Sequence, residues 1–441
     1  MTKESIAIVG GGIGGIACAL ELSKTASFSI TVFEKEKHLG GLSSYYQWND
    51  IIFDRFYHVI LPTDNHLINF VTELGLESEL FWRPVKSGFY KYGKIASMSS
   101  ILDFIRFPFL SPWQKIRLGL GILYATNIKV PDKLDKIYAK QWLSKIFGER
   151  IYQNIWEPLL QSKLGNATEI VSAAFIWATI SRLYGTRSSK EKRERMGHVI
   201  GGYNKILKCA QRRLEESKVK LITNTRVQEI DLSEEDHIIL KATSGSMRFD
   251  RLVLTVSCPE VLRILAGKLN NQYWQKIQTI KYCNIICVLL VLKKKLSPYY
   301  VINLLDRSIP FTGIIESTNI ISPSTLDNNH LVYLPKYTTD EDPINTKSDE
   351  EIKTLFIKRL RDVYPKMNDE DILFAEVFRE SYVQPIQERN FSEKIVSFRT
   401  PQKKVFLVNS SMIQDSTLNN NAIIKLARDA VKIINNDNNK M

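Results

Sequence analysis

The chain has 441 residues, of which 44% are hydrophobic, and a formal net charge of +13. This length excludes a single small domain, and the longest charge-free stretch, Ser5–Leu20, is shorter than the ~20 residues that a membrane-spanning helix needs. Five cysteines, an odd number in apolar surroundings, argue against a disulfide framework and indicate a cytoplasmic protein, while the positive charge favours contact with anions.

The N-terminal segment predicts a strand, a glycine-rich turn, a helix and a second strand. Ser5–Val9 and Ser29–Phe33 are short apolar runs typical of buried parallel strands, and the spacing between them is helical. Gly10, Gly12 and Gly15 occupy the three glycine positions of a dinucleotide-binding fingerprint. The first permits a tight turn, the second lets a pyrophosphate approach the backbone, and the third allows close packing of helix and strand.

The same segment contains the other groups that such a site needs. A phosphate at this turn would lie at the helix N-terminus, beside the backbone N–H groups of Ile13 and Gly14. Glu34 ends the second strand, where it can accept hydrogen bonds from ribose hydroxyls, and Lys35 follows it. The sequence therefore predicts a dinucleotide site, which the fingerprint alone leaves open between NAD and FAD.

The middle of the chain has a different pattern. Between Leu67 and Trp177 the apolar spacing is mostly helical and is interrupted by prolines, which predicts an inserted helical region. Within it, Ile101–Ile128 is apolar and aromatic with basic residues interspersed. Two interpretations fit this segment: a lid over a substrate cavity, or a peripheral contact with a membrane.

A return to the cofactor domain is predicted near Gly201, with a helix, Tyr203–Ser217, followed by strands, one of them ending at Val227. Strand-like runs with one helix then indicate a sheet-based substrate domain, and a last strand and helix follow from Val405. We therefore expect a discontinuous cofactor domain made of residues 1–60, 197–265 and 395–441, a helical insertion at 61–196 and a substrate domain at 266–394.

A second glycine pair favours one of the two dinucleotides. The run His38-Leu39-Gly40-Gly41-Leu42-Ser43-Ser44, together with the fingerprint, resembles the extended FAD motif of the amine oxidase, protoporphyrinogen oxidase and phytoene desaturase superfamily. In that superfamily the doublet passes close to the pyrophosphate and the ribityl chain. The resemblance implies FAD as the cofactor, with contacts from Gly40, Gly41, Leu42 and Ser43. Leu42 stands where many amine oxidases have arginine.

The resemblance extends over almost the full length of the chain. Within the superfamily, the sequence is similar to a bacterial, protoporphyrinogen-oxidase-like branch of FAD-dependent oxidoreductases. It places Val227 where the family's valine meets adenine through its backbone, and it carries over Asn409, Thr417 and Asn420 near the flavin, although the arginine of the family's C-terminal run is absent. The implied fold is α/β: a Rossmann-type, GR2-like FAD-binding domain with an inserted mixed α+β substrate domain and a helical subdomain.

The resemblance implies an FAD-dependent oxidoreductase that oxidises or desaturates a small, hydrophobic or amine-bearing substrate by hydride transfer to flavin N5. Two alternatives stay open: a non-redox flavoenzyme resembling UDP-galactopyranose mutase, and a non-catalytic binding protein of the same fold. We expect a small-molecule substrate, no nucleic-acid partner and no metal. The sequence does not specify the oligomeric state.

Four side chains are candidates for the chemistry. His58 follows the glycine doublet at a distance that a hairpin can bridge, so it is predicted to contact the flavin ring, the alternative being a structural histidine beside Tyr57. Glu157 is a candidate buried carboxylate in the cavity, or else a capping or surface residue. Lys163 and Arg182 are candidate anchors for an anionic substrate, or else solvated side chains.

Overall fold

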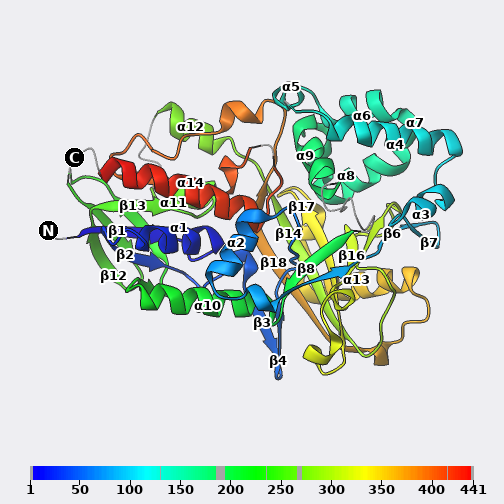
Figure 1. Cartoon of the computed structure of the whole chain (residues 1–441), viewed down its shortest axis with the longest axis horizontal. Helices are drawn as coiled ribbons and strands as arrows, with labels where there is room; N and C mark the ends of the chain where they lie inside the picture. The colour runs from blue at the N-terminus through cyan, green and yellow to red at the C-terminus, as the bar shows by residue number, and fades with distance from the viewer. Residues whose placement is uncertain are drawn as a thin grey trace.

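The computed structural model describes residues 3–129, 131–184, 194–234, 236–265, 271–414 and 416–438 (Figure 1). Its first layer is a parallel sheet of five strands whose members come from distant parts of the chain. In spatial order they are β19 (Val405–Leu407), β13 (Arg251–Leu254), β1 (Glu4–Val9), β2 (Phe28–Phe33) and β9 (Lys220–Ile222).

Both faces of this sheet are covered, which explains why its strands are continuous apolar runs. Helices that pack on one face are α1 (Ile13–Ser23), α2 (Asn65–Glu73), α10 (Gly202–Glu216) and α14 (Asn420–Asn438). Elements on the other face are a three-stranded sheet, β10 (Val227–Asp231), β11 (Ile238–Ala242) and β12 (Gly245–Phe249), and the helices α11 (Cys258–Ile264) and α12 (Gln272–Gln278).

A second, seven-stranded sheet forms the other half of the molecule. Its order is β18 (Ile372–Pro385), β14 (Tyr282–Leu292), β17 (His330–Thr338), β16 (Gly313–Glu316), β15 (Val301–Leu304), β6 (Ser87–Lys91) and β7 (Lys94–Ser97). Helix α13 (Asp349–Val363) packs on one face. The opposite face packs against the hairpin of β3 (Tyr45–Trp48) and β4 (Ile51–Asp54), so the chain that follows the glycine doublet joins the two sheets.

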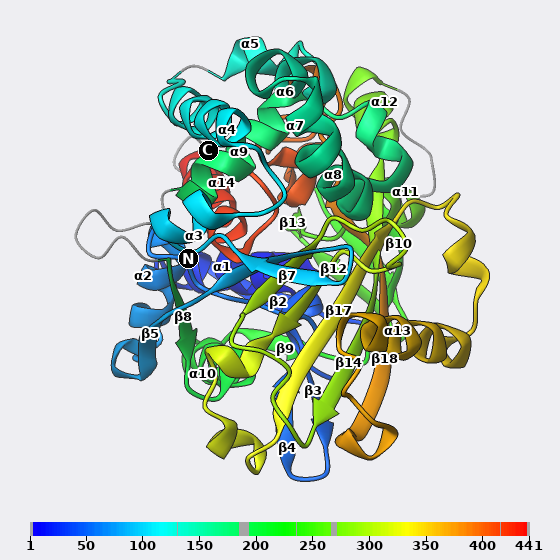
Figure 2. The same cartoon turned by 90° about the vertical axis from the view of Figure 1, so that its right-hand side faces the viewer.

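Most of the remaining helices gather at one end of the molecule, as Figure 2 shows. They are α3 (Ile101–Arg106), α4 (Pro112–Thr126), α5 (Asp132–Asp135), α6 (Ala139–Phe147), α7 (Glu149–Ile151), α8 (Glu157–Leu164) and α9 (Ala173–Tyr184). Their shared core contains large buried side chains such as Phe107, Trp142 and Phe147. Across the described ranges of the chain, we find no helix with the length and apolar character to cross a membrane.

The structure differs from the sequence-based expectations in three segments. Residues 80–97, inside the block of mostly helical spacing, form β6, β7 and β5 (Leu80–Pro84), which pairs with β8 (Arg195–Val199). The prediction that a strand ends at Val227 is wrong: β10 begins there, because the chain turns just before it at Asn224, whose φ is +51°. The hairpin expected to bring the chain to His58 ends earlier: the chain leaves the β3–β4 ladder at Asp54, and the run Phe56–Ile60 beyond it is not a strand.

Candidate cofactor site and active site

The glycines of the turn between β1 and α1 have different structural roles. Gly10 has a φ of +110°, a conformation that favours glycine. A Cβ atom on Gly15 would lie 1.9 Å from the carbonyl oxygen of Gly10, so only glycine lets α1 approach the end of β1 this closely. Gly12 has a φ of −71°, and the nearest atom to an added Cβ would be Cα of Gly41, 3.9 Å away. An added Cβ at Gly12 would therefore make only ordinary van der Waals contact, so neither the protein's packing nor the backbone conformation requires glycine there.

The first turn of α1 leaves its backbone N–H groups free. Within the described chain, no side chain caps this helix, whose N-cap is Gly12. By contrast, Asp54 accepts a hydrogen bond from the Tyr203 N–H at the start of α10 (2.9 Å), and Asn419 accepts one from the Ala422 N–H in α14 (2.9 Å). Free N–H groups and the positive end of the helix dipole make the start of α1 suited to a phosphate.

Glu34 lies where the fingerprint predicts it, at the end of β2 beside the turn. Its carboxylate accepts hydrogen bonds from the backbone N–H of Gly11 (2.7 Å) and of Glu36 (3.0 Å), and the side chain is 7% exposed. Burial raises the pKa of this carboxyl, while the two N–H groups oppose the rise. Lys35 is exposed and lies 3.5 Å from the Glu36 carboxylate. Glu34 thus closes the turn and keeps lone pairs for a ribose.

The glycine doublet lies directly against the first turn. The Gly40 N–H donates to the carbonyl oxygen of Gly11 (2.8 Å), and a Cβ on Gly41 would approach Cα of Gly12 to 3.2 Å. Both glycines have positive φ, +130° and +55°. The doublet therefore lies beside Gly12, and the partly buried Leu42 packs against the hydrophobic core that includes Ile51 and Phe53 of β4.

His58 belongs to a cluster that joins four parts of the chain. Its Nδ1 lies 2.8 Å from the Phe56 carbonyl oxygen, and since a carbonyl only accepts, Nδ1 carries the proton and Nε2 is an acceptor. Ser43 Oγ lies 3.5 Å from Nε2 and accepts a hydrogen bond from Asn420 Nδ2 (3.0 Å). The ring of Tyr203, at the start of α10, lies 4.8 Å from the imidazole, centroid to centroid.

The environment keeps the His58 imidazole neutral. Burial lowers the pKa of His58 to about 4, and the hydrogen bond to Phe56 opposes this shift only in part. The side chain nevertheless retains some accessible surface. At neutral pH this residue is therefore a hydrogen-bonding group and not a source of positive charge.

The other predicted cofactor residues lie around the same edge of the parallel sheet. Val227 is buried, and its carbonyl oxygen accepts a hydrogen bond from Arg263 Nη2 (3.0 Å). Asn409 is 3% exposed; it accepts from the Ser411 N–H (3.1 Å) and donates to the Val256 carbonyl oxygen (2.8 Å), so its side chain is used inside the protein. Thr417 is buried just before α14.

Glu157 and Arg182 are each engaged in an ion pair. Glu157 begins α8 and lies 2.5 Å from Arg307 Nη2, whose side chain is largely exposed. Arg182 Nη2 contacts both carboxylate oxygens of the buried Asp64, at 3.2 and 3.1 Å. In the part of the chain that the structure describes, neither contacts the glycine turn or His58. Their roles in catalysis and in substrate binding stay predictions.

Lys163 has a different environment. Its ammonium lies 5.9 Å from the ring centroid of Phe175 and 6.0 Å from that of Tyr337, and no carboxylate among the described residues pairs with it. Burial lowers its pKa. Tyr337 in turn shares a hydrogen bond with Tyr57 (3.1 Å between hydroxyls), the neighbour of His58 in sequence.

Sequence reasoning missed two residues of the site. Asp54 is 7% exposed, and burial raises the pKa of its carboxyl to about 7; it binds the N–H of Tyr203 and thereby places that ring against His58. The signal for Asp54 is an acid within the apolar run that ends β4. Tyr203 has no local signal beyond the two glycines before it, because its contact with His58 arises only from the tertiary fold.

Two cavities in the described chain lie away from the glycine turn. One, of about 530 Å³, is on α4; the other, of about 300 Å³, lies beside α5 and α9. Residues that line the second are Asp132, Asp135, Lys136, Ala174, Gln387, Phe391, Ser392 and Gln414. The candidate cofactor site therefore depends on the glycine backbone and its partners, and not on the shape of either cavity.

The sequence profile of the family described as flavin containing amine oxidoreductase matches residues 13–400. The chain belongs to this family. The predicted superfamily is confirmed, and the protein is an enzyme of the flavin-containing amine oxidoreductase class. No functionally curated protein matches the sequence.

Several solved structures share the fold over almost the whole chain. A provisionally assigned protoporphyrinogen oxidase from Exiguobacterium sp. 255-15 has 15% identity and a TM-score of 0.78, over 99% of this chain and 100% of that one. Reduced UDP-galactopyranose mutase has 14% identity and a TM-score of 0.76, over 98% and 96%. Putrescine oxidase bound to putrescine has 16% identity and a TM-score of 0.72, over 99% of each chain. The predicted α/β fold class is confirmed.

Proposed function

We propose that this flavin-family enzyme binds FAD and oxidises or desaturates a small molecule by hydride transfer to flavin N5. The observation that carries the proposal is a turn in which the protein's own packing does not require the glycine at position 12, next to the uncapped start of α1, the Glu34 carboxylate and the glycine doublet. These groups fit a diphosphate and a ribose, the two parts that distinguish FAD from FMN.

The residues divide between the two halves of the cofactor. The turn and Glu34 would hold the ADP half, while Ser43, His58 and Asn420 would meet the ribityl chain and the ring. FAD supplies the hydride acceptor when it is bound. Because His58 is neutral and its Nε2 is unprotonated, we assign it the role of accepting a hydrogen bond that orients the ring or the substrate.

We expect the substrate to lie beside an aromatic group of residues next to His58. Tyr57 directs its hydroxyl to Tyr337 on the seven-stranded sheet, and Lys163 lies over the Tyr337 ring with no described carboxylate beside it. An unpaired ammonium repels a protonated amine, whereas tyrosine rings pack well against apolar surface. This environment supports a hydrophobic, neutral or anionic substrate more than a polyamine.

Anaerobic reduction tests the proposal. The purified protein, loaded with FAD, is mixed without oxygen with a panel of hydrophobic donors and of amines, and the visible band of oxidised flavin is followed. We expect bleaching by members of the hydrophobic set. A protein that binds FAD but is reduced by none of the donors, and turns over only after chemical reduction, would point to a non-redox flavoenzyme of the mutase type.

A further inference from the structure

Helices α3 and α4 expose an unusual amount of apolar side chain. Trp113 is 81% exposed, and seven other large hydrophobic residues on the two helices are between 49% and 66% exposed. We call this set the α3–α4 surface; its members are Ile101, Leu102, Ile105, Trp113, Ile116, Leu120, Leu123 and Tyr124. Single exposed hydrophobic residues are ordinary, but a contiguous group on adjacent helices marks an interaction site.

The fold uses only the other side of α4. Gly121 packs so tightly on α6 that an added Cβ would lie 2.4 Å from Phe147, and Trp177 Nε1 of α9 donates to the carbonyl oxygen of Ala125 (2.9 Å). The outward residues recur every three or four positions, which places them along one stripe of the helix. A lid over a substrate cavity would explain the buried side of α4 but leaves this outward stripe without a role.

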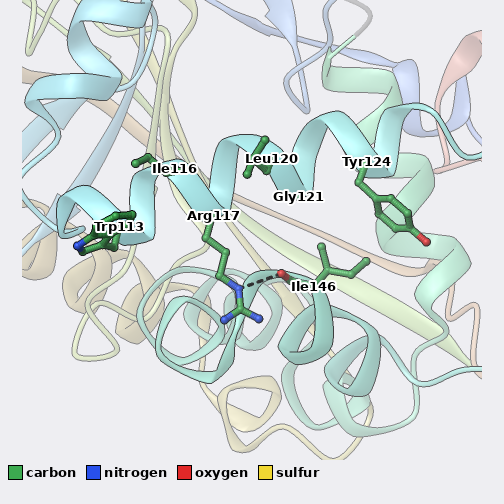
Figure 3. A pocket seen from close by; sticks show the side chains of 7 residues that line it. All are labelled: Trp113, Ile116, Arg117, Leu120, Gly121, Tyr124 and Ile146. Atoms are coloured by element: carbon green, nitrogen blue, oxygen red, sulfur yellow. Dashed lines mark hydrogen bonds between the residues drawn. The ribbon is translucent and has the colours of Figure 1, made fainter.

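Figure 3 shows the groove of about 530 Å³ along this stripe. Trp113 and Tyr124 lie near opposite ends of the helix, with Leu120 between them, and Arg117 reaches across to the carbonyl oxygen of Ile146 (3.1 Å). The amphipathic rings of Trp and Tyr favour the boundary between water and lipid headgroups.

The charged residues in the segment that carries this surface are mostly basic. Between Lys94 and Lys129 the chain has five basic residues and one acid, Asp103, which accepts a hydrogen bond from Ser97 Oγ (2.7 Å). Arg106 is exposed at the end of α3 and has no ion-pair partner among the described residues. A surface of this kind is complementary to an anionic layer.

We propose that the α3–α4 surface docks on the face of a lipid bilayer that contains anionic lipid. Helix α4 has 15 residues and a length of about 22 Å, too short to span a bilayer, so it would lie in the plane of the interface. Its apolar stripe would enter the headgroup boundary, while Arg106, Lys115 and Arg117 meet lipid phosphates. This inference is independent of the proposed flavin chemistry.

Charge argues against a second copy of the chain as the occupant. In a two-fold symmetric dimer the surface would face itself, and its basic residues would meet one another, with Asp103 the one acid that the segment from Lys94 to Lys129 offers in each copy. Like charges brought together without counter-charges disfavour such an interface. Anionic lipid supplies the counter-charges at the same place as the apolar layer.

Vesicle sedimentation tests the proposal with the full-length protein. Phosphatidylcholine vesicles with and without phosphatidylserine are incubated with wild type, and bound protein is measured. We expect binding to the anionic vesicles that falls as salt rises. The variant Leu120→Glu/Leu123→Glu should lower binding more than about tenfold, since two leucines no longer bury apolar surface. Arg106→Glu changes the charge of the surface by two units, and each unit should lower vesicle binding roughly fivefold.

Matched variants outside the surface keep the test specific. Leu373→Glu changes an exposed leucine on β18, and Lys208→Glu reverses an exposed lysine on α10; both should bind like wild type. Vesicles should also shift the tryptophan emission to shorter wavelength, and Trp113→Phe should remove that shift. Three results would overturn the proposal: no binding of wild type to either vesicle, equal binding by Leu120→Glu/Leu123→Glu, or a wild-type dimer in solution that this variant dissociates.

Discussion

The carbonyl oxygen of Gly10 lies 1.9 Å from the position that a Cβ atom on Gly15 would take. The backbone at the end of β1 and that at the start of α1 are thus so close that no side chain fits between them at Gly15. At Gly12, by contrast, the nearest atom that the structure describes outside Gly12 and its two neighbours would be Cα of Gly41, 3.9 Å from an added Cβ. One glycine therefore serves the fold and the other leaves room for a ligand.

This difference predicts opposite outcomes for two substitutions. Gly12→Val should fold and melt close to wild type without flavin, yet contain no FAD, because its side chain fills the space of the pyrophosphate. Gly15→Ala should lower the free energy of unfolding by at least about 1–3 kcal/mol, the cost of overpacking. Thermal melting of the apoproteins and flavin content of the purified variants measure both. Undiminished FAD in a folded Gly12→Val protein would refute the placement of the cofactor.

Glu34 is predicted to contribute to FAD binding through its ribose contact. Glu34→Ala should weaken FAD binding by about 1–3 kcal/mol, the range for a lost charge-assisted hydrogen bond. Glu34→Gln keeps one acceptor for the Gly11 N–H and should lose less. Titration of apoprotein with FAD, followed by flavin fluorescence, gives both values. Equal affinities in all three proteins would show that Glu34 only closes the turn.

His58 should affect turnover more than cofactor retention. His58→Ala and His58→Gln are expected to keep stoichiometric FAD, because the glycine turn is untouched, but to shift the flavin absorption or slow its reduction. His66→Gln is the matched control: His66 lies on α2 and contacts Asn421 through its backbone N–H. Spectra and reduction kinetics identical to wild type in both His58 variants would make His58 a structural residue.

The buried carboxyl of Asp54 should make the stability of the folded protein depend on pH. Its carboxyl has a pKa raised by burial to about 7 in the folded protein, above the usual value of about 4. The stability that the protonated carboxyl provides is therefore complete below about pH 4 and is lost as the pH rises through 7. Asp54→Asn keeps the acceptor for the Tyr203 N–H but does not titrate.

Urea unfolding of wild type and Asp54→Asn between pH 4 and 8 tests this sign. The variant should gain stability relative to wild type as the pH rises, by up to roughly 1.4 kcal/mol per pH unit until pH 7. Asp50→Asn, at an exposed position in the β3–β4 turn, should show no such trend. A difference between Asp54→Asn and wild type that does not change with pH would contradict the buried, protonated state.

Local sequence predicted the part of the site whose geometry is local. The β1-turn-α1-β2 unit and Glu34 follow from residues within one short segment, so spacing alone located them. The contact between Ser43 and Asn420 spans 377 residues, and that between Asp54 and Tyr203 spans 149. Nothing in the sequence near either pair specifies its partner, since both contacts depend on how α10 and α14 pack on α1.

Contacts between distant segments also explain why the sequence did not predict all strands of the seven-stranded sheet. β6 pairs in parallel with β15, Ser87 with Val301, across more than two hundred residues. The apolar spacing around it is mostly helical, and a strand of five residues has too few alternations to stand out. The helical interpretation of residues 61–196 therefore missed the strands that bring this segment into the seven-stranded sheet.

The identity of the bound flavin tests the central claim most directly. The purified protein is denatured, and the released chromophore is separated and compared with FAD and FMN standards. We predict a yellow protein that releases FAD in near-stoichiometric amount, because the start of α1, Gly12 and Glu34 together fit the ADP half of the dinucleotide. A colourless protein that takes up no FAD on reconstitution, or one that releases only FMN, would contradict the account.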